Sequence, residues 1–249
     1  MKTITFSIQK GGVGKTTMSV SVAAELAKHG KTLLIDGDSQ GNSTTWLVDS
    51  LDYELADVLM KKCNVKEAIQ PTKIENLFIL PTAGVGGELR KYALFEAPTK
   101  HNAIKNLLGN VALEGFDYCI FDTSPAFNPM ERNICYASDE IVAVLQLDVF
   151  SADGMETFTS NIKELREDEG LPTDKPLFNK IVFNARDERL SQQTKFLEDF
   201  NKLSGYNYHI VPVDQAFKKA QGLHCSVADI QNVKKETLEA IEKLARSLM

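Results

Sequence analysis

The chain has 249 residues, of which 43% are hydrophobic and 25% are charged, and its four cysteines lie far apart with no C-x-x-C pair. This composition is typical of a globular chain that buries a large core without help, and it excludes the usual disulfide, zinc and iron–sulfur patterns. The net charge of −6, taken alone, argues against a nucleic-acid partner. The charge is uneven, however, because 17 basic and 25 acidic residues lie within residues 1–175, whereas 11 basic and 9 acidic residues lie within residues 176–249.

No stretch of the sequence has the features of a membrane span or a signal peptide. No apolar run approaches roughly 18 residues, and residues 3–8 alternate between apolar and polar side chains. We therefore expect a cytoplasmic protein. No repeat, low-complexity tract or flexible linker interrupts the chain, so we expect residues 1–249 to form a single domain.

Strand-like and helix-like segments alternate along the chain. Residues 3–9 are predicted to form a strand, and residues 17–28 a helix that carries Met18, Val22 and Leu26 on one face and ends at Gly30. Short apolar runs predict further strands at residues 32–35, 77–80, 118–121, 141–147, 180–183 and 208–211. Such runs joined by helices predict an α/β fold with a mostly parallel sheet, helices on both faces, and ligands at the carboxyl ends of the strands.

Two later segments are predicted to be amphipathic helices. The first has Ser151 as its candidate N-cap, and the second covers residues 231–248. Each helix carries apolar side chains at helical spacing, which we expect to face the core. These side chains are Met155, Phe158, Ile162 and Leu165 in the first helix, and Val233, Leu238, Ile241 and Leu244 in the second.

The segment after the first predicted strand is rich in glycine and reads Gln9-Lys10-Gly11-Gly12-Val13-Gly14-Lys15-Thr16-Thr17. Glycines allow a tight turn whose N–H groups point at phosphate oxygens, and the start of the next helix adds partial positive charge. Lys15 is placed to contact the β- and γ-phosphates, and the Thr16 hydroxyl to bind Mg²⁺. The segment therefore predicts a P-loop NTPase that binds ATP or ADP, with Mg²⁺, through residues 10–17.

This loop departs from the usual G-x-x-x-x-G-K-[ST] pattern, because Gln9 stands at the first position and a second lysine, Lys10, lies inside the loop. In this respect it resembles the deviant P-loop of the ParA/MinD family, K-G-G-x-G-K-[ST]. The resemblance implies a homodimer in which Lys10 reaches the nucleotide of the other subunit. There Lys10 would act as an arginine finger does, by offsetting charge on the transferring phosphoryl group.

Two other predicted strands end in aspartate, at Asp36-Gly37-Asp38 and at Asp122. Carboxylates at strand ends beside a P-loop can hold Mg²⁺ through water and orient an attacking water. Residues 36–42 resemble the D-x-D-P-Q-G-N motif of ParA-type partition ATPases, with Ser39 in place of proline, and residues 122–125 resemble their D-x-x-P. The resemblance implies that Asp38 positions the hydrolytic water, while Asp36 and Asp122 support the magnesium ion.

Three residues of the last third are candidates for the adenine site. Asn184 ends a predicted strand where related P-loop proteins place an asparagine that reads the base, although an ordinary turn residue is an equally good interpretation. Pro212 and Asp214 fall where partition ATPases carry Pro-Arg-Asn. Val213 stands in place of the arginine that the resemblance implies for DNA contact.

Non-specific DNA binding requires basic side chains gathered on one face, because its free energy comes from phosphate neutralisation and counterion release. The net-positive last third supplies such candidates, namely Arg186, Arg189, Lys218, Lys219, Lys234 and Lys235, with Lys195, Lys243 and Arg246 as further ones. An ordinary solvated helix face is the alternative, because Glu239 can pair with Lys243, and Glu242 with Arg246. These glutamates also argue against binding to an anionic membrane.

The resemblance implies an ATP-driven switch for DNA partition. An ATP-bound homodimer would bind non-specific DNA on the nucleoid, and a ParB-like partner would stimulate slow, Mg²⁺-dependent hydrolysis. The first predicted strand begins at Thr3, so we expect no N-terminal helix-turn-helix. Three alternatives stay open: a positioning ATPase for a protein cargo, a MinD-like membrane switch, and a metabolic P-loop ligase or reductase.

Overall fold

The computed structural model describes residues 1–148, 150–171, 178–187, 189–202 and 207–249. Within them, eight strands form one sheet in the order β3-β4-β2-β5-β1-β6-β7-β8. The strands are β1 (Lys2–Ser7), β2 (Thr32–Asp36), β3 (Gln70–Pro71), β4 (Leu77–Leu80), β5 (Tyr118–Asp122), β6 (Glu140–Leu145), β7 (Phe178–Arg186) and β8 (Asn207–Pro212). Neighbouring strands are parallel except β3, which pairs antiparallel with β4 at the edge. The predicted mostly parallel sheet is confirmed.

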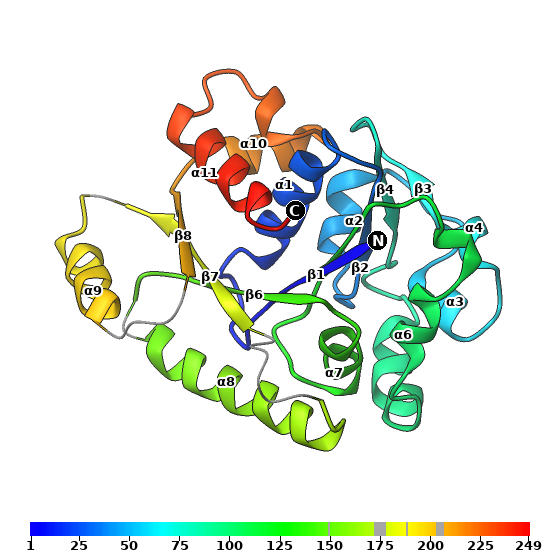
Figure 1. Cartoon of the computed structure of the whole chain (residues 1–249). Helices are drawn as coiled ribbons and strands as arrows, with labels where there is room; N and C mark the ends of the chain where they lie inside the picture. The colour runs from blue at the N-terminus through cyan, green and yellow to red at the C-terminus, as the bar shows by residue number, and fades with distance from the viewer. Residues whose placement is uncertain (149, 172–177, 188, 203–206) are drawn as a thin grey trace.

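Helices cover both faces of the sheet, as predicted (Figure 1). One face carries α1 (Lys15–Leu26), α2 (Asn42–Leu47), α10 (Ala216–Leu223) and α11 (Lys235–Arg246). The other carries α6 (Ala103–Leu108), α7 (Pro129–Tyr136) and α8 (Phe150–Asp168), and α9 (Ser191–Lys202) lies beside β7 and β8. The remaining helices are α3 (Leu55–Leu59), α4 (Val65–Ala68) and α5 (Leu89–Lys91), the π-helix η1 (Tyr92–Glu96), and the 3₁₀ turns η2 (Ala97–Thr99), η3 (Val111–Leu113) and η4 (Val227–Asp229).

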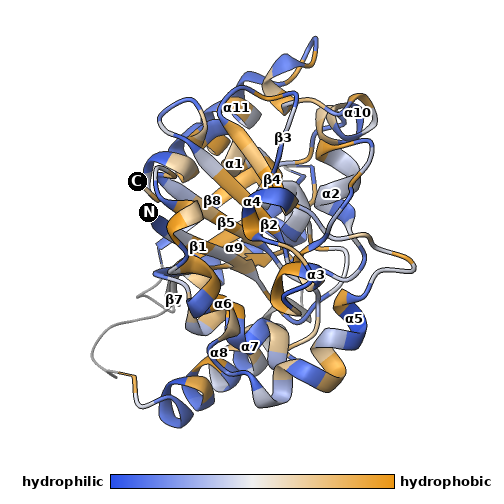
Figure 2. Ribbon diagram, turned by 90° about the vertical axis from the view of Figure 1, so that its right-hand side faces the viewer, coloured by the Kyte–Doolittle hydropathy of each residue, from blue (hydrophilic) through white to orange (hydrophobic). Residues whose placement is uncertain are grey.

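The strands form the centre of the core, and Figure 2 shows them as hydrophobic segments inside more hydrophilic helices. Leu33, Leu34 and Ile35 of β2 are completely buried. A strand with helices on both faces has no solvent side, which explains why β2 is a continuous apolar run without alternation.

The predicted helices exist, with shifted boundaries. In α1, Met18, Val22 and Leu26 are completely buried, as expected. Helix α8 buries Phe158 but begins at Phe150, so Ser151 lies inside its first turn and the N-cap prediction was wrong. A serine is compatible with either position, and helix ends are the least certain part of such a prediction.

The last helix begins later than predicted, because a distant residue fixes its start. Asp214 Oδ2 accepts hydrogen bonds from the Lys234 backbone N–H at 3.0 Å and from the Thr237 hydroxyl at 2.8 Å. Helix α11 therefore begins at Lys235. Ile241 and Leu244 are buried as expected, whereas Val233 and Leu238 are partly buried.

The strand order determines where the acidic residues lie. Strand β5 pairs with both β1 and β2, so it separates the P-loop strand from the strand that ends in Asp36. In the register of β2 and β5, Asp36 lies directly opposite Asp122. The carboxyl ends of β1, β5 and β2 thus place the P-loop and both acidic segments at one edge of the sheet.

Candidate nucleotide site

The P-loop connects β1 to α1 through two glycines in the left-handed region, Gly12 with φ +73° and Gly14 with φ +96°. Gly14 also lies against Asn184, whose Nδ2 would be 2.0 Å from a β-carbon at position 14. Backbone conformation and packing therefore both require glycine there. At Gly11 and Gly12 a β-carbon would meet nothing within 4 Å, so the outer side of the loop is open.

The two lysines of the loop have different partners. Lys15 is buried, and its Nζ donates a hydrogen bond of 2.9 Å to the Lys10 carbonyl oxygen. Burial lowers the pKa of Lys15, while the carboxylates of Asp122 and Asp38 oppose that effect. Lys10 Nζ lies 2.9 Å and 2.7 Å from the two carboxylate oxygens of Asp148. Lys15 is thus directed into the loop, whereas Lys10 is directed toward Asp148, on the segment after β6.

The carboxyl groups of Asp36 and Asp122 are completely buried beside the loop. Asp36 Oδ2 accepts hydrogen bonds from the Thr44 N–H at 2.9 Å and from the Thr44 hydroxyl at 2.6 Å. Asp122 Oδ1 accepts a hydrogen bond of 3.3 Å from the Ser19 hydroxyl. Burial raises the pKa of Asp36 to about 6. Burial, together with the neighbouring Asp36, raises the pKa of Asp122 to about 8. The site thus gathers acidic groups whose ionisation is disfavoured by burial and only partly offset by the nearby Lys15 ammonium.

These residues fit a magnesium ion. Asp122 Oδ2 is buried and has no hydrogen-bond partner among the described residues, so it is an oxygen ligand left without a partner. The Thr16 side chain lies near enough to the same carboxyl group to lower its pKa. The part of the chain that the structure describes holds no group of three or more His, Cys, Asp or Glu side chains arranged as a metal site. This agrees with Mg²⁺ chemistry, in which water and substrate phosphates supply most ligands.

Asp38 and Glu131 complete the acidic group. Asp38 is buried, and its Oδ1 accepts the Gln40 N–H at 2.9 Å. Glu131, in the first turn of α7, is also buried and accepts hydrogen bonds from the Ser124 hydroxyl and from the Asn128 N–H. Burial raises the pKa of Glu131 to about 7.

Sequence reasoning missed Glu131, Asp148 and Thr44. Glu131 could have been found from the sequence, because Asn128-Pro129-Met130-Glu131 is a capping-box pattern with proline at the first helical position. Asp148 and Thr44 had none of comparable strength. Their importance depends on contacts with Lys10 and Asp36, which only the fold creates.

The three candidates for the adenine site lie near the carboxyl ends of β7 and β8. Asn184 lies within β7, which continues to Arg186, so it neither ends the strand as predicted nor is a turn residue. Asn184 is buried and donates a hydrogen bond of 2.8 Å from Nδ2 to the Val13 carbonyl, so it supports the P-loop from behind. Pro212 is the last residue of β8. Asp214 accepts hydrogen bonds from Ala216, as well as from the residues that start α11. Adenine binding by these residues stays a prediction.

The basic candidates of the last third partly converge. The Arg186 carbonyl accepts the Val213 N–H at 2.9 Å, and Lys234 Nζ donates a 2.7 Å hydrogen bond to the Val213 carbonyl. Arg189 is exposed and pairs with Asp187 at 2.5 Å. These residues therefore lie together beyond the carboxyl ends of β7 and β8. DNA contact stays a prediction for them.

The other basic candidates are exposed on helices, namely Lys218 and Lys219 on α10, Lys195 on α9, and Lys235, Lys243 and Arg246 on α11. Arg246 pairs with Glu242 at 2.7 Å, as expected. Glu239 pairs with Lys235 at 3.1 Å, which differs from the expected pairing with Lys243.

A family model described as an AAA domain matches residues 1–173. The sporulation initiation inhibitor protein Soj of Bacillus subtilis (strain 168) is 30% identical over 207 residues, which cover 81% of this chain and 79% of Soj. The chain belongs to the ParA/Soj family of partition ATPases. The chromosome-partitioning ATPase Soj of Treponema pallidum (strain Nichols) is 28% identical to this ParA/Soj chain over 253 residues, covering 100% of it and 97% of the relative.

A solved structure shows the same fold as this ParA/Soj-type chain. The septum site-determining protein MinD of Pyrococcus horikoshii OT3, complexed with Mg-ADP, superposes with a TM-score of 0.79 over 99% of this chain and 95% of its own, at 21% identity. The fold is therefore that of the P-loop NTPases. Among the residues described for the ParA/Soj chain, no helix is both long enough and apolar enough to cross a membrane.

Proposed function

We propose that residues 1–249 act as one ATP-hydrolysing unit that dimerises with ATP and serves in DNA partition. One observation carries the proposal. Lys15 and Asp38 converge with Asp122, whose Oδ2 has no hydrogen-bond partner among the described residues, while the second loop lysine, Lys10, is directed elsewhere, onto Asp148. Membership of the ParA/Soj family supports the same activity.

Residues 11–16 are suited to hold the phosphates of ATP, because the loop is open and leads into the amino-terminal end of α1. Thr16, Asp36 and Asp122 would hold the magnesium ion directly or through water. When bound, the ion supplies positive charge to the phosphate oxygens. Asp38 accepts a hydrogen bond from its own loop and has a second carboxylate oxygen available to orient the attacking water.

Lys10 is the residue that makes hydrolysis depend on a second subunit in this proposal. Its side chain is 26% exposed and pairs with Asp148, which is 35% exposed. A lysine at this position can exchange its partner at small cost, since partly exposed ion pairs contribute little stability. In an ATP-bound homodimer it would then offset charge on the phosphoryl group of the other subunit.

The basic residues at the ends of β7 and β8, with those on α10 and the start of α11, form the proposed DNA surface. Each subunit offers only a few uncompensated charges, so its contact with DNA should be weak. Dimerisation doubles the contacts and makes the second one intramolecular, which couples DNA binding to ATP. We propose that a ParB-like protein stimulates the slow hydrolysis, and that the ATP state is cytoplasmic and nucleoid-associated.

The decisive test is a salt titration of duplex DNA binding in the presence of ATP and of ADP. Log affinity should fall linearly with log salt concentration, and only with ATP. Lys15→Ala serves as the control, because it should lose ATP binding and therefore DNA binding. If wild-type protein with ATP shows no salt-sensitive binding to duplex DNA, the ATP-bound dimer does not act on DNA, and a protein or membrane surface is then the better candidate for what it binds.

A further inference from the structure

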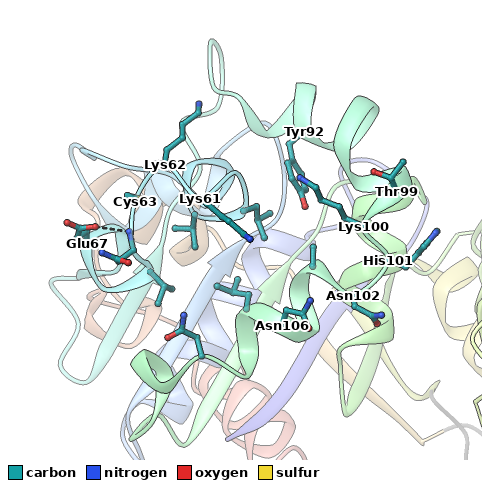
Figure 3. A pocket seen from close by; sticks show the side chains of 17 residues that line it. Lys61, Lys62, Cys63, Glu67, Tyr92, Thr99, Lys100, His101, Asn102 and Asn106 are labelled. Carbon is teal, nitrogen blue, oxygen red and sulfur yellow. Dashed lines mark hydrogen bonds between the residues drawn. The ribbon is translucent and has the colours of Figure 1, made fainter.

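A second cavity lies apart from the nucleotide site, between α3 and α4 on one side and η1, η2 and α6 on the other (Figure 3). Its volume is about 910 Å³, within the size range of known ligand pockets. None of the residues assigned above to nucleotide, magnesium or DNA lines it. The cavity therefore has no role in the proposed ATPase chemistry.

The lining of the cavity is basic, although the whole chain is acidic. Lys61, Lys62 and Lys100 line it together with one carboxylate, that of Glu67, while Lys62 pairs with Asp57 at 3.2 Å and Lys100 pairs with Glu96 outside the lining. The Glu67 carboxylate caps α4, because it accepts the Asn64 N–H at 2.7 Å. His101 also lies at the edge of the cavity (Figure 3). The ion pairs of Lys62 and Lys100 are partly exposed and contribute little stability, so the carboxylates of an anionic ligand can replace Asp57 and Glu96 at these lysines.

Lys61 occupies a position at which glycine is normally found. Its φ is +60°, and the chain closes α3 with hydrogen bonds from the Lys61 N–H to the Val58 carbonyl at 3.0 Å and from the Lys62 N–H to the Asp57 carbonyl at 2.8 Å. This is the Schellman ending of a helix, which places its left-handed residue at Lys61. Lys61 thus lines the cavity from a backbone position where glycine would be less strained. The Lys61 side chain forms no ion pair among the described residues.

A buried polar group faces the same space. Tyr92 is 1% exposed, and its hydroxyl has no hydrogen-bond partner within the described part of the chain. Figure 3 shows the hydroxyl end of the ring directed toward the interior of the cavity beside Lys100. Lys100 Nζ lies 5.4 Å from the centre of the ring and pairs with Glu96 at 2.7 Å. A polar group of a ligand in the cavity could supply the partner that this hydroxyl lacks among the described residues.

The other lining side chains are suited to a peptide. The floor includes apolar side chains, among them Leu59 and Leu107, which can hold an apolar anchor. Side-chain amides on the opposite wall, such as those of Asn102 and Asn106, can pair with a peptide backbone because each is both donor and acceptor. A small anion that has no peptide backbone would not pair with the side-chain amides of Asn102 and Asn106.

We propose that this cavity binds a short, extended, acidic segment of a partner protein. Carboxylates of the segment contact Lys61, Lys62 and Lys100, and an apolar side chain between them rests on Leu59 and Leu107. The inference goes beyond the proposed function, because it requires neither nucleotide nor dimerisation.

The test uses the full chain and two synthetic decapeptides, one of alternating Glu and Leu, and one in which Gln replaces every Glu. Binding is followed by NMR of the ¹⁵N-labelled protein without nucleotide. The acidic peptide should shift the amide signals of residues 58–67 and 99–110, and the Gln peptide should not. Lys61→Gly should weaken binding about fivefold, the typical value of one partly exposed ion pair, without loss of stability, because glycine relaxes the backbone.

Two further variants separate binding from folding. Tyr92→Phe removes a hydroxyl that has no hydrogen-bond partner among the described residues, so it should leave the free energy of unfolding unchanged or higher and still weaken binding of the acidic peptide. Lys66→Ala is the matched control, because it removes an equal charge from α4 at a position outside the cavity and should not alter binding. The proposal would be overturned if the Gln peptide bound as tightly as the acidic peptide, or if both Lys61→Gly and Tyr92→Phe bound the acidic peptide with full affinity. It would also be overturned if inorganic phosphate or duplex DNA displaced the acidic peptide as effectively as unlabelled acidic peptide does.

Discussion

Lys10 and Asp148 are 138 positions apart in the chain, and their side chains form a two-point ion pair, with Lys10 Nζ 2.9 Å and 2.7 Å from the carboxylate oxygens. If Lys10 must leave Asp148 to serve the nucleotide of a second subunit, the pair opposes dimerisation. Asp148→Asn should therefore raise the ATP-dependent dimer fraction and the basal ATP turnover about fivefold. Sedimentation and phosphate release measure these quantities, with Asp148→Glu as the charge-conserving control. Weaker dimerisation of Asp148→Asn would show that Asp148 instead belongs to the dimer interface.

Replacement of Asp38 should separate ATP binding from hydrolysis. Asp38→Ala removes the carboxylate that orients the attacking water, so hydrolysis should fall by at least about a hundredfold, while ATP affinity and dimerisation persist. Single-turnover phosphate release and a fluorescent ATP analogue measure the two effects. Asp57→Ala, a change of the same kind on α3, should leave both unchanged. Undiminished hydrolysis in Asp38→Ala would remove Asp38 from this role.

Gly14 should tolerate no side chain while Asn184 stays in place. Gly14→Ala combines an unfavourable φ of +96° with a β-carbon 2.0 Å from Asn184 Nδ2. We expect a loss of about 3 kcal/mol in unfolding free energy. Adding Asn184→Ala should recover the steric part only, so a double-mutant cycle in urea should show a favourable coupling of about 1 kcal/mol or more. Strict additivity of the two substitutions would contradict the close packing.

Glu131 should make the nucleotide-free protein less stable as pH rises. Burial raises its pKa from 4.5 to about 7, so the folded state holds the proton more tightly than the unfolded chain does. The resulting stabilisation is complete below about pH 4.5 and is lost as pH rises through about 7. Glu131→Gln should lack this loss and gain up to about 3 kcal/mol relative to wild type across the window. Urea unfolding from pH 5 to pH 8 measures the free energy of unfolding of both proteins. If that free energy changed with pH in the same way in wild type and Glu131→Gln, the raised pKa of Glu131 would be refuted.

Local chemistry made much of the nucleotide site predictable from sequence. A P-loop needs glycine, lysine and threonine at fixed spacing between a strand and a helix, and residues 11–16 show that pattern without reference to any distant residue. Asp36 and Asp122 could be assigned to strand ends because buried parallel strands are continuous apolar runs. The alternation of strands and helices likewise predicted a sheet with helices on both faces, because buried parallel strands must be joined by helices that cover them.

The same local logic failed where a boundary or a partner depends on distant residues. Ser151 resembles an N-cap, yet α8 begins one residue earlier. The start of α11 is fixed by Asp214, which lies on the loop after β8. The start of α11 does not follow from the helical pattern, because hydrogen bonds from another part of the chain outweigh the small preferences of single residues.

The sequence by itself thus determined the type of fold and the chemistry of the phosphate site, since both depend on residue type and short spacing. The tertiary structure alone decided that β5 lies between β1 and β2, which places Asp122 opposite Asp36 and leaves the Asp122 Oδ2 without a hydrogen-bond partner among the described residues. It also decided that Lys10 pairs with Asp148, and that Tyr92 and Lys61 meet at one cavity. These relationships join residues far apart in the chain, and strand order and packing, which no local pattern encodes, bring them together.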